Sequence, residues 1–126
     1  MKKKIKLLIV EDEVIFVQSL CIDLESDNYE VCCYATTGEE AVIKAEKAKP
    51  DLVLMDINLP GKIDGIDAAR EISEVYNIPI IFMTGYRDPF IFERAQKVNP
   101  VAYLTKPVET SRLKSIIDSY IAERLS

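Results

Sequence analysis

Short apolar segments alternate with segments of helical periodicity from one end of this chain to the other. The apolar segments are rich in Ile, Leu and Val, which is typical of strands that are covered on both faces. We predict strands over residues 5–10, 29–34, 52–55, 78–83 and 101–104. The alternation predicts an α/β fold of the (βα)5 type, in which a doubly wound parallel sheet carries helices on both faces.

The strand order follows from the same pattern. For five strands the common doubly wound order is 2-1-3-4-5, which is flavodoxin-like. Ligands of such sheets bind beyond the carboxyl ends of the strands, where strands 1 and 3 lie side by side. We therefore expect any functional site at the carboxyl ends of the predicted strands.

Three of the expected helices begin with recognisable sequence signals. Thr37 and, three residues later, Glu40 form a capping box. Asp88 precedes Pro89, and proline is favoured at the first helical position. Thr110 is expected to cap the last helix.

The composition is that of an ordinary globular domain, with 48% hydrophobic and 29% charged residues. A length of 126 residues suits one hydrophobic core, so we predict a single domain over residues 1–126. No apolar run is long enough to cross a bilayer, which argues against membrane insertion. The basic residues 2–4 lead into an apolar stretch too short for a signal peptide, so we expect a cytoplasmic protein.

Charge and residue usage exclude several classes of function. The net charge of −5 argues against direct binding of nucleic acid, which needs clustered Lys and Arg. The chain has no histidine, which excludes Ser-His-Asp catalysis, His-ligated zinc and a role as phosphohistidine donor. The cysteines form no CxxC motif and are expected to be reduced and structural; they are Cys21, Cys32 and Cys33. As neighbours on a strand, Cys32 and Cys33 are expected to point to opposite faces of the sheet.

Polar side chains follow the predicted strands at their carboxyl ends. Glu11 and Asp12 come after the first strand, and Asp56 comes after the third. Thr84 follows the fourth strand, and Lys106 follows the fifth. Each has a plain structural alternative, such as a helix cap for Asp12 or a loop lysine for Lys106. Their joint occurrence along one edge of the sheet favours a functional site.

Three neighbouring carboxylates repel one another unless a cation lies between them. Oxygen ligands without His or Cys favour a hard divalent ion, and Mg²⁺ fits because it keeps positions for water and phosphate oxygens. An aspartate beside a metal ion and a lysine can act as a nucleophile toward phosphorus. The residues therefore predict a magnesium-dependent phosphoryl-transfer site at Asp56.

Four stretches of the sequence are similar to those of a known family. They are IVEDE (9–13), LVLMDINLPG (52–61), MTG (83–85) and YLTKP (103–107). With their spacing, they resemble the response-regulator receiver domain of two-component signal transduction over essentially the whole chain. The sequence departs from the family pattern at two places: the loop at 60–65 is one residue longer than the commonest version, and Gly85 stands where Ala is frequent.

The resemblance implies a role for each acidic residue of the predicted site. Asp56 matches the phosphoacceptor. The Mg²⁺ ligands of the family match Glu11, Asp12, Asp56 and the main-chain carbonyl of Asn58. The resemblance implies that Asp12 binds the ion directly and that Glu11 binds it through water.

The remaining site residues match the switch of the family. Thr84 matches the hydroxyl that closes on the phosphoryl group, and Tyr103 matches the aromatic residue that turns inward with it, although core packing would also explain Tyr103. Lys106 matches the lysine that pairs with the phosphate. The resemblance also implies a cis peptide bond between Lys106 and Pro107, which proline tolerates at little energetic penalty.

The function that the resemblance implies is a phosphorylation-dependent switch. The phosphohistidine of a sensor histidine kinase or of a histidine phosphotransfer protein supplies the phosphoryl group. The surface of the fourth helix, fifth strand and fifth helix then changes toward a downstream effector or homodimer partner. Self-dephosphorylation is expected to be slow, and Asn58 and Tyr86 match the two positions that modulate it, with Tyr86 expected to shield the phosphoryl group from water.

If the chain is such a phosphorylation-dependent switch, we expect it not to be an enzyme in the ordinary sense. One alternative is an interaction module with a receiver fold and no phosphorylation, which the intact set of acids, threonine and lysine disfavours. Another is a phosphohydrolase of the haloacid dehalogenase type with an Asp nucleophile. The sequence disfavours it because Ile57 and Asn58 follow Asp56, where that family has a DxD motif.

Overall fold

The computed structural model describes residues 4–26, 28–85 and 87–125, and in this part of the chain strands and helices alternate strictly. The strands are β1 (Ile5–Val10), β2 (Tyr29–Ala35), β3 (Leu52–Asp56), β4 (Ile80–Thr84) and β5 (Ala102–Thr105). The helices are α1 (Val14–Leu24), α2 (Gly38–Ala48), α3 (Gly65–Tyr76), α4 (Pro89–Gln96) and α5 (Thr110–Leu125). All strand pairs are parallel, and the order β2-β1-β3-β4-β5 confirms the predicted topology.

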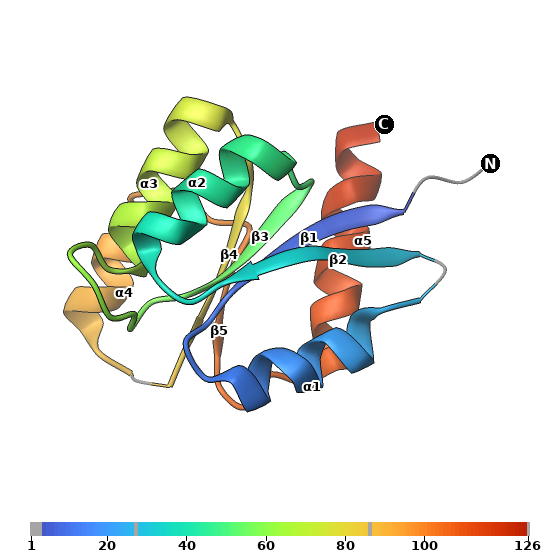
Figure 1. The fold of residues 1–126 in the computed structure, drawn as a ribbon, viewed down its shortest axis with the longest axis horizontal. Coiled ribbons are helices and arrows are strands. Elements are labelled where there is room, and N and C mark those ends of the chain that lie inside the picture. Colours follow the sequence, from blue (N-terminus) through green and yellow to red (C-terminus); the bar gives the residue numbers. More distant parts are fainter. Residues whose placement is uncertain (1–3, 27, 86, 126) are drawn as a thin grey trace.

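Helices cover both faces of the sheet, with α2, α3 and α4 on one side and α1 and α5 on the other (Figure 1). Successive residues of a strand point to opposite faces, so the sheet divides the core into two clusters. In β1, Leu8 and Val10 pack in the cluster on the α2 and α3 side, whereas Leu7 and Ile9 pack in the cluster on the α1 and α5 side. None of the helices within the described residues is both long and apolar enough to cross a membrane.

The strands differ from the sequence prediction mainly at their ends. The fourth strand was expected over 78–83 but runs from Ile80 to Thr84. Pro79 lies just before it, and proline has no N–H to donate to a ladder, although its carbonyl accepts from Val53. The shift makes Thr84 the last residue of β4, where it pairs with Thr105 of β5. The pairing of β4 with β5 therefore fixes the position of the Thr84 backbone.

Two of the three predicted helix starts are confirmed. The Thr37 hydroxyl accepts from the backbone N–H of Glu40 at 3.1 Å, and the Asp88 carboxylate accepts from Phe90 at 2.9 Å, directly before Pro89. The prediction for Thr110 is wrong, because this residue is already inside α5. Its hydroxyl donates to Asp23 of α1 at 3.1 Å instead of capping its own helix.

The expectation that Cys32 and Cys33 point to opposite faces is also wrong. Their sulfur atoms lie 3.4 Å apart. The reason is a break in the pairing of β1 with β2, in which Val31 is opposite Leu7 and Cys33 is opposite the next residue, Leu8. Cys32 is the extra residue of a β-bulge, and a bulge interrupts the alternation of side chains along a strand.

Candidate functional site

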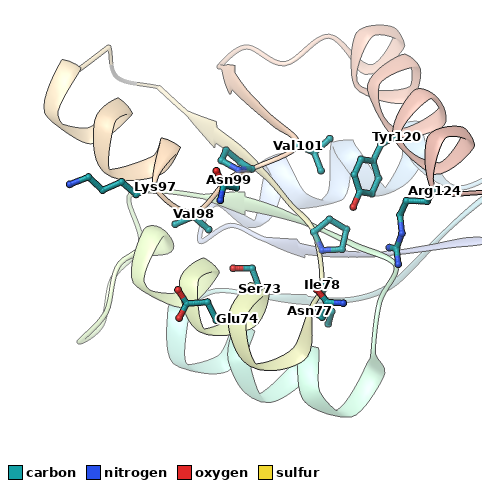
Figure 2. Close-up of a pocket in the computed structure, with 12 residues that line it drawn as sticks. Ser73, Glu74, Asn77, Ile78, Lys97, Val98, Asn99, Val101, Tyr120 and Arg124 are labelled. Carbon is teal, nitrogen blue, oxygen red and sulfur yellow. The ribbon is translucent and has the colours of Figure 1, made fainter.

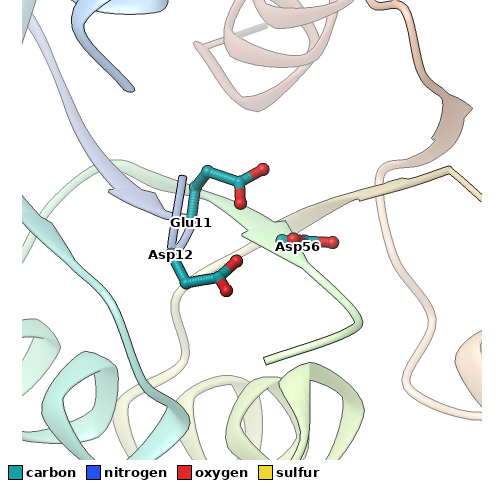
Figure 3. Close-up of side chains that lie close together, drawn as sticks. All are labelled: Glu11, Asp12 and Asp56. Atoms are coloured by element: carbon teal, nitrogen blue, oxygen red, sulfur yellow. The ribbon is translucent and has the colours of Figure 1, made fainter. Parts of the chain in front are cut away.

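Three carboxylates meet where the central strands end. Glu11 follows β1, Asp12 is next to it, and Asp56 ends β3, so all three lie at the switch point of the sheet (Figure 3). One oxygen from each lies within 4.8 Å of the others. Glu11 is fully buried and Asp56 is 4% exposed, whereas Asp12 is open to solvent. The structure therefore brings together the acids that the sequence predicted. Two of them, Glu11 and Asp56, are buried.

The start of α3 packs closely against the end of β3, where Asp56 lies. Gly65 donates its backbone N–H to the carbonyl of Ile57 at 2.9 Å. A Cβ atom at Gly65 would lie 2.0 Å from the Asp56 carbonyl oxygen, which is far inside van der Waals contact. Only glycine allows the helix to begin this close to β3.

Lys106 reaches the acids from the end of β5. Its ammonium nitrogen lies 3.3 Å from Asp56 Oδ2 and also forms a short ion pair with Glu11. The same nitrogen lies over the ring of Phe16, 4.7 Å from its centre. Phe16 belongs to α1 and had no predicted role, because nothing in its helical spacing indicates a contact with a lysine ninety residues away. The Lys106–Pro107 peptide bond is cis, the isomer that the resemblance implies.

The buried charges perturb one another. Burial, followed by repulsion from Glu11, raises the pKa of Asp56 to about 7, although Lys106 opposes the shift. Burial also acts to raise the pKa of Glu11, but hydrogen bonds from Lys106 and from the N–H of Glu13 outweigh it and lower that pKa. Burial and the charge of Glu11 raise the pKa of Asp12. The cluster thus has more negative charge than Lys106 alone neutralises.

These residues fit a magnesium ion. All their donor atoms are oxygens, and the carboxylates are grouped closely enough to share one cation. Asn58 follows Asp56 by two residues and donates its N–H to Asp56 Oδ1 at 3.3 Å, which fixes the loop beside the acids. Burial raises the pKa of Asp56 and repulsion from Glu11 adds to the shift, and a divalent cation would relieve that repulsion.

Glu39 of α2 anchors the long loop after β3. Its carboxylate accepts from the backbone N–H groups of Lys62 at 2.7 Å and Ile63 at 2.9 Å. Gly61 has a φ of 107°, and a Cβ there would lie 2.6 Å from the Glu39 carboxylate. Glu39, for which the sequence predicted no role, therefore ties the loop at 60–65 to α2.

Thr84 and Tyr103 lie on neighbouring strands beside the acids. Thr84 is fully buried, and its carbonyl accepts from the N–H of Lys106 at 2.7 Å. The Tyr103 ring contacts Phe82 and Phe92 edge to face, with ring centres 6.5 and 5.0 Å apart. Its hydroxyl is buried and makes no hydrogen bond of standard geometry with the described residues. Tyr86, the other predicted aromatic residue, lies outside the described residues.

Two cavities differ in their relation to this site. One, of about 660 Å³, is lined by Asn58, Thr84 and residues 87–91, so it opens beside the acidic cluster. The other, of about 570 Å³, lies at the opposite end of the sheet between α3 and α5, where Tyr120 and Arg124 line it (Figure 2). Among the described residues, none that the sequence predicts for the site lines the second cavity. The acidic cluster and the first cavity therefore lie at the same edge of the sheet, at the carboxyl ends of the strands.

Residues 7–118 match the sequence model of the response regulator receiver domain. The chain belongs to this family. Transcriptional regulatory protein PdtaR of Mycobacterium tuberculosis is 41% identical to the receiver domain over 113 residues, which cover 90% of this chain and 55% of PdtaR. The receiver domain described here spans about half the length of the curated relatives it matches.

Solved structures agree with this assignment. The signal receiver domain of a modulated diguanylate cyclase from Desulfovibrio desulfuricans has a TM-score of 0.90 and 40% identity, with 96% of each chain covered. CheY of Borrelia burgdorferi, solved as a complex with CheX, BeF3 and Mg²⁺, has a TM-score of 0.82 and 27% identity over 92% of this chain and 88% of that one. The receiver domain is a signalling domain of two-component response regulators rather than an ordinary enzyme.

Proposed function

We propose that residues 1–126 form one receiver domain that takes a phosphoryl group onto Asp56. The donor is the phosphohistidine of a sensor histidine kinase or of a histidine phosphotransfer protein. The observation that carries this proposal is the position of the Asp56 carboxylate, which is buried at the end of β3 with one oxygen 3.3 Å from the Lys106 ammonium. Membership of the receiver family supports the same chemistry.

The transfer needs an ionised Asp56 and neutralised phosphoryl oxygens. A carboxylate oxygen attacks phosphorus, the P–N bond to the donor imidazole breaks, and the imidazole nitrogen keeps the electron pair and takes up a proton. Lys106 offsets charge on the phosphoryl oxygens, and the Thr84 hydroxyl provides a hydrogen-bond donor at the end of the neighbouring strand. Positioning and charge compensation are the main requirements of this reaction, and the site supplies both.

Magnesium would be held by the carboxylates of Glu11, Asp12 and Asp56 and by the main-chain carbonyl of Asn58. When bound, the ion supplies positive charge to the carboxylates and to the phosphoryl oxygens. Two observations support this assignment: the oxygen-only donor set, and the BeF3 and Mg²⁺ in the similar CheY complex. Asp56 has a pKa near 7 without a cation, so positive charge beside it favours the ionised nucleophile.

Phosphorylation would change the partners of Lys106 and Thr84. Lys106 now pairs with Glu11 and Asp56, and a phosphoryl group adds three acceptor oxygens at the same place. Tyr103 would move with Thr84, because its hydroxyl interacts with the Thr84 side chain and its ring lies against Phe92 of α4. We propose that the surface of α4, β5 and α5 changes in this way and that an effector or a second copy binds it.

The lifetime of the phosphorylated form depends on how water reaches Asp56. Asn58 lines the cavity beside the site, where its amide can orient water. Tyr86 remains the predicted shield, although it lies outside the described residues. Slow self-dephosphorylation and a cytoplasmic location stay predictions. The output of the whole protein is a further proposal: the curated relatives are named transcriptional regulators, so we expect a role in gene regulation.

Phosphoramidate tests the phosphoacceptor because its P–N bond resembles that of phosphohistidine. Intact-mass measurement with Mg²⁺ present should show one added phosphoryl group, and Asp56→Asn should abolish it. Asp51→Asn is the matched control, because Asp51 is an exposed aspartate at the other end of β3 and should leave labelling unchanged. Full labelling of Asp56→Asn would refute the proposal, and absence of labelling in wild type would favour an interaction module without phosphorylation.

A further inference from the structure

Two adjacent cysteines lie on the edge strand of the sheet, away from the phosphorylation site. In the described part of the chain, strand β2 pairs with β1 alone and forms an edge of the sheet (Figure 1). Cys32 and Cys33 are both partly buried and both carry free thiols. Their sulfur atoms are 3.4 Å apart, in van der Waals contact. Neither thiol has a part in the proposed phosphoryl transfer.

The β-bulge explains why the two sulfurs meet. Val31 packs with the core cluster on the α1 and α5 side, as Tyr29 does. Cys33 packs with the cluster on the other face, as Ala35 does. The strand therefore changes face at Cys32, the extra residue between two consecutive pairs of the ladder. Cys32 and Cys33 consequently lie on the same side instead of on opposite sides.

A disulfide between these residues would be strained. Neighbouring Cα atoms are about 3.8 Å apart across a trans peptide bond, whereas the Cα atoms of disulfides are usually separated by about 4.4–6.8 Å. A structural zinc site is also a poor fit, because zinc takes about four protein ligands. Within the described part of the chain, no Asp, Glu or third Cys completes a ligand group with these two sulfurs.

We propose that Cys32 and Cys33 form a vicinal dithiol site that binds one trivalent arsenical. Trivalent arsenic makes three bonds that stand nearly at right angles to one another, so two sulfurs bonded to it lie close to van der Waals contact. The two thiols already have this separation. The third bond goes to the substituent of the arsenical, so no further protein ligand is needed. The partly buried thiols remain open to a small reagent on the edge strand.

The reaction is a condensation without a change of oxidation state. Two S–H bonds and the As=O bond of an arsine oxide break, two S–As bonds form, and one molecule of water leaves with both thiol protons. Burial, and the neighbouring Cys33 thiol, raise the pKa of Cys32 to about 12. Simple alkylation, which needs a thiolate, should therefore be slow at Cys32. Condensation with an arsine oxide consumes both thiol protons as water. It therefore favours reaction at the two thiols together over alkylation of Cys32 alone.

Phenylarsine oxide is a suitable probe. One equivalent added to the reduced full chain should add one phenylarsenic group by intact mass. The adduct should survive an excess of the monothiol 2-mercaptoethanol and be removed by the dithiol 2,3-dimercaptopropanol. Cys32→Ser and Cys33→Ser should each lose the monothiol-resistant adduct. Cys21→Ser should keep it, because Cys21 packs with the cluster on the opposite face from Cys33.

A second measurement tests whether binding of the arsenical depends on the folded geometry or only on the presence of two adjacent cysteines in the sequence. A ligand that binds the folded state better than the unfolded state raises the unfolding midpoint. Phenylarsine oxide should therefore raise the midpoint of wild type and of Cys21→Ser. The proposal is overturned if the midpoint falls, if 2-mercaptoethanol strips the wild-type adduct, or if Cys32→Ser retains a monothiol-resistant adduct.

Discussion

Replacing Asp56 by asparagine should stabilise the receiver domain against unfolding at alkaline pH when no divalent cation is present. The carboxylate is 4% exposed and stands beside the buried Glu11, so its ionised form is unfavourable in the folded state. Asparagine keeps the shape of the side chain and removes the charge. A phosphoacceptor would thus be a site at which the native residue reduces stability, as is common for functional sites.

The structure gives the sign and the upper limit of the effect. Folding raises the pKa of Asp56 from 3.8 to about 7, so the stability that the neutral acid provides is present at low pH and is lost as the pH rises from near 4 through about 7. Each unit of pKa corresponds to about 1.4 kcal/mol, so the ionised acid costs at most about 4 kcal/mol above pH 7. Lys106 loses one of its two carboxylate partners in the variant. We therefore expect a net gain of about 1–3 kcal/mol.

Urea unfolding of wild type and Asp56→Asn at pH 5 and pH 8, with EDTA, measures the effect. The variant should be more stable at pH 8, and the difference should shrink at pH 5, where Asp56 is mostly protonated in the folded state. Millimolar Mg²⁺ should reduce the difference in stability at pH 8, because it should stabilise wild type more than the variant, which lacks one of the proposed carboxylate ligands. Glu71→Gln, at an exposed carboxylate of α3, is the control and should show no such pattern. Equal stabilities at both pH values would refute the electrostatic argument.

Two further substitutions test how the loops around the site are held. Gly65→Ala should lower the free energy of unfolding by about 1–3 kcal/mol in urea titrations, because its Cβ would meet the Asp56 carbonyl. The control Gly85→Ala, whose Cβ would meet nothing within 4 Å, should leave the free energy of unfolding nearly unchanged. Similar losses of stability in both variants would contradict this account. Glu39→Ala should speed hydrogen exchange at the amides of Lys62 and Ile63, because both donate to that carboxylate. Glu39→Gln keeps an acceptor oxygen and should leave the exchange of these amides slow. Unchanged exchange in Glu39→Ala would show that the loop does not depend on Glu39 for its conformation.

The topology and the meeting of Glu11, Asp12 and Asp56 could be predicted from the sequence because both depend on local patterns. Apolar runs and helical spacing identify the elements, and alternation limits them to a doubly wound sheet. Parallel strands end at a common edge, so the polar residues after each run must lie near one another. Glu11 and Asp56 met for this reason, although forty-five residues separate them.

What the tertiary structure decided depends on distances between segments that no local pattern encodes. The bulge at Cys32 arises from how β2 pairs with β1, and it reversed the expected direction of a side chain. The contact of Phe16 with Lys106 depends on how α1 lies against the end of β5. The pKa of Asp56 depends on how much water the surrounding elements exclude and on where Glu11 comes to lie. Sequence patterns report which residues share an edge or a face, whereas packing sets the separations and the burial on which electrostatics and reactivity depend.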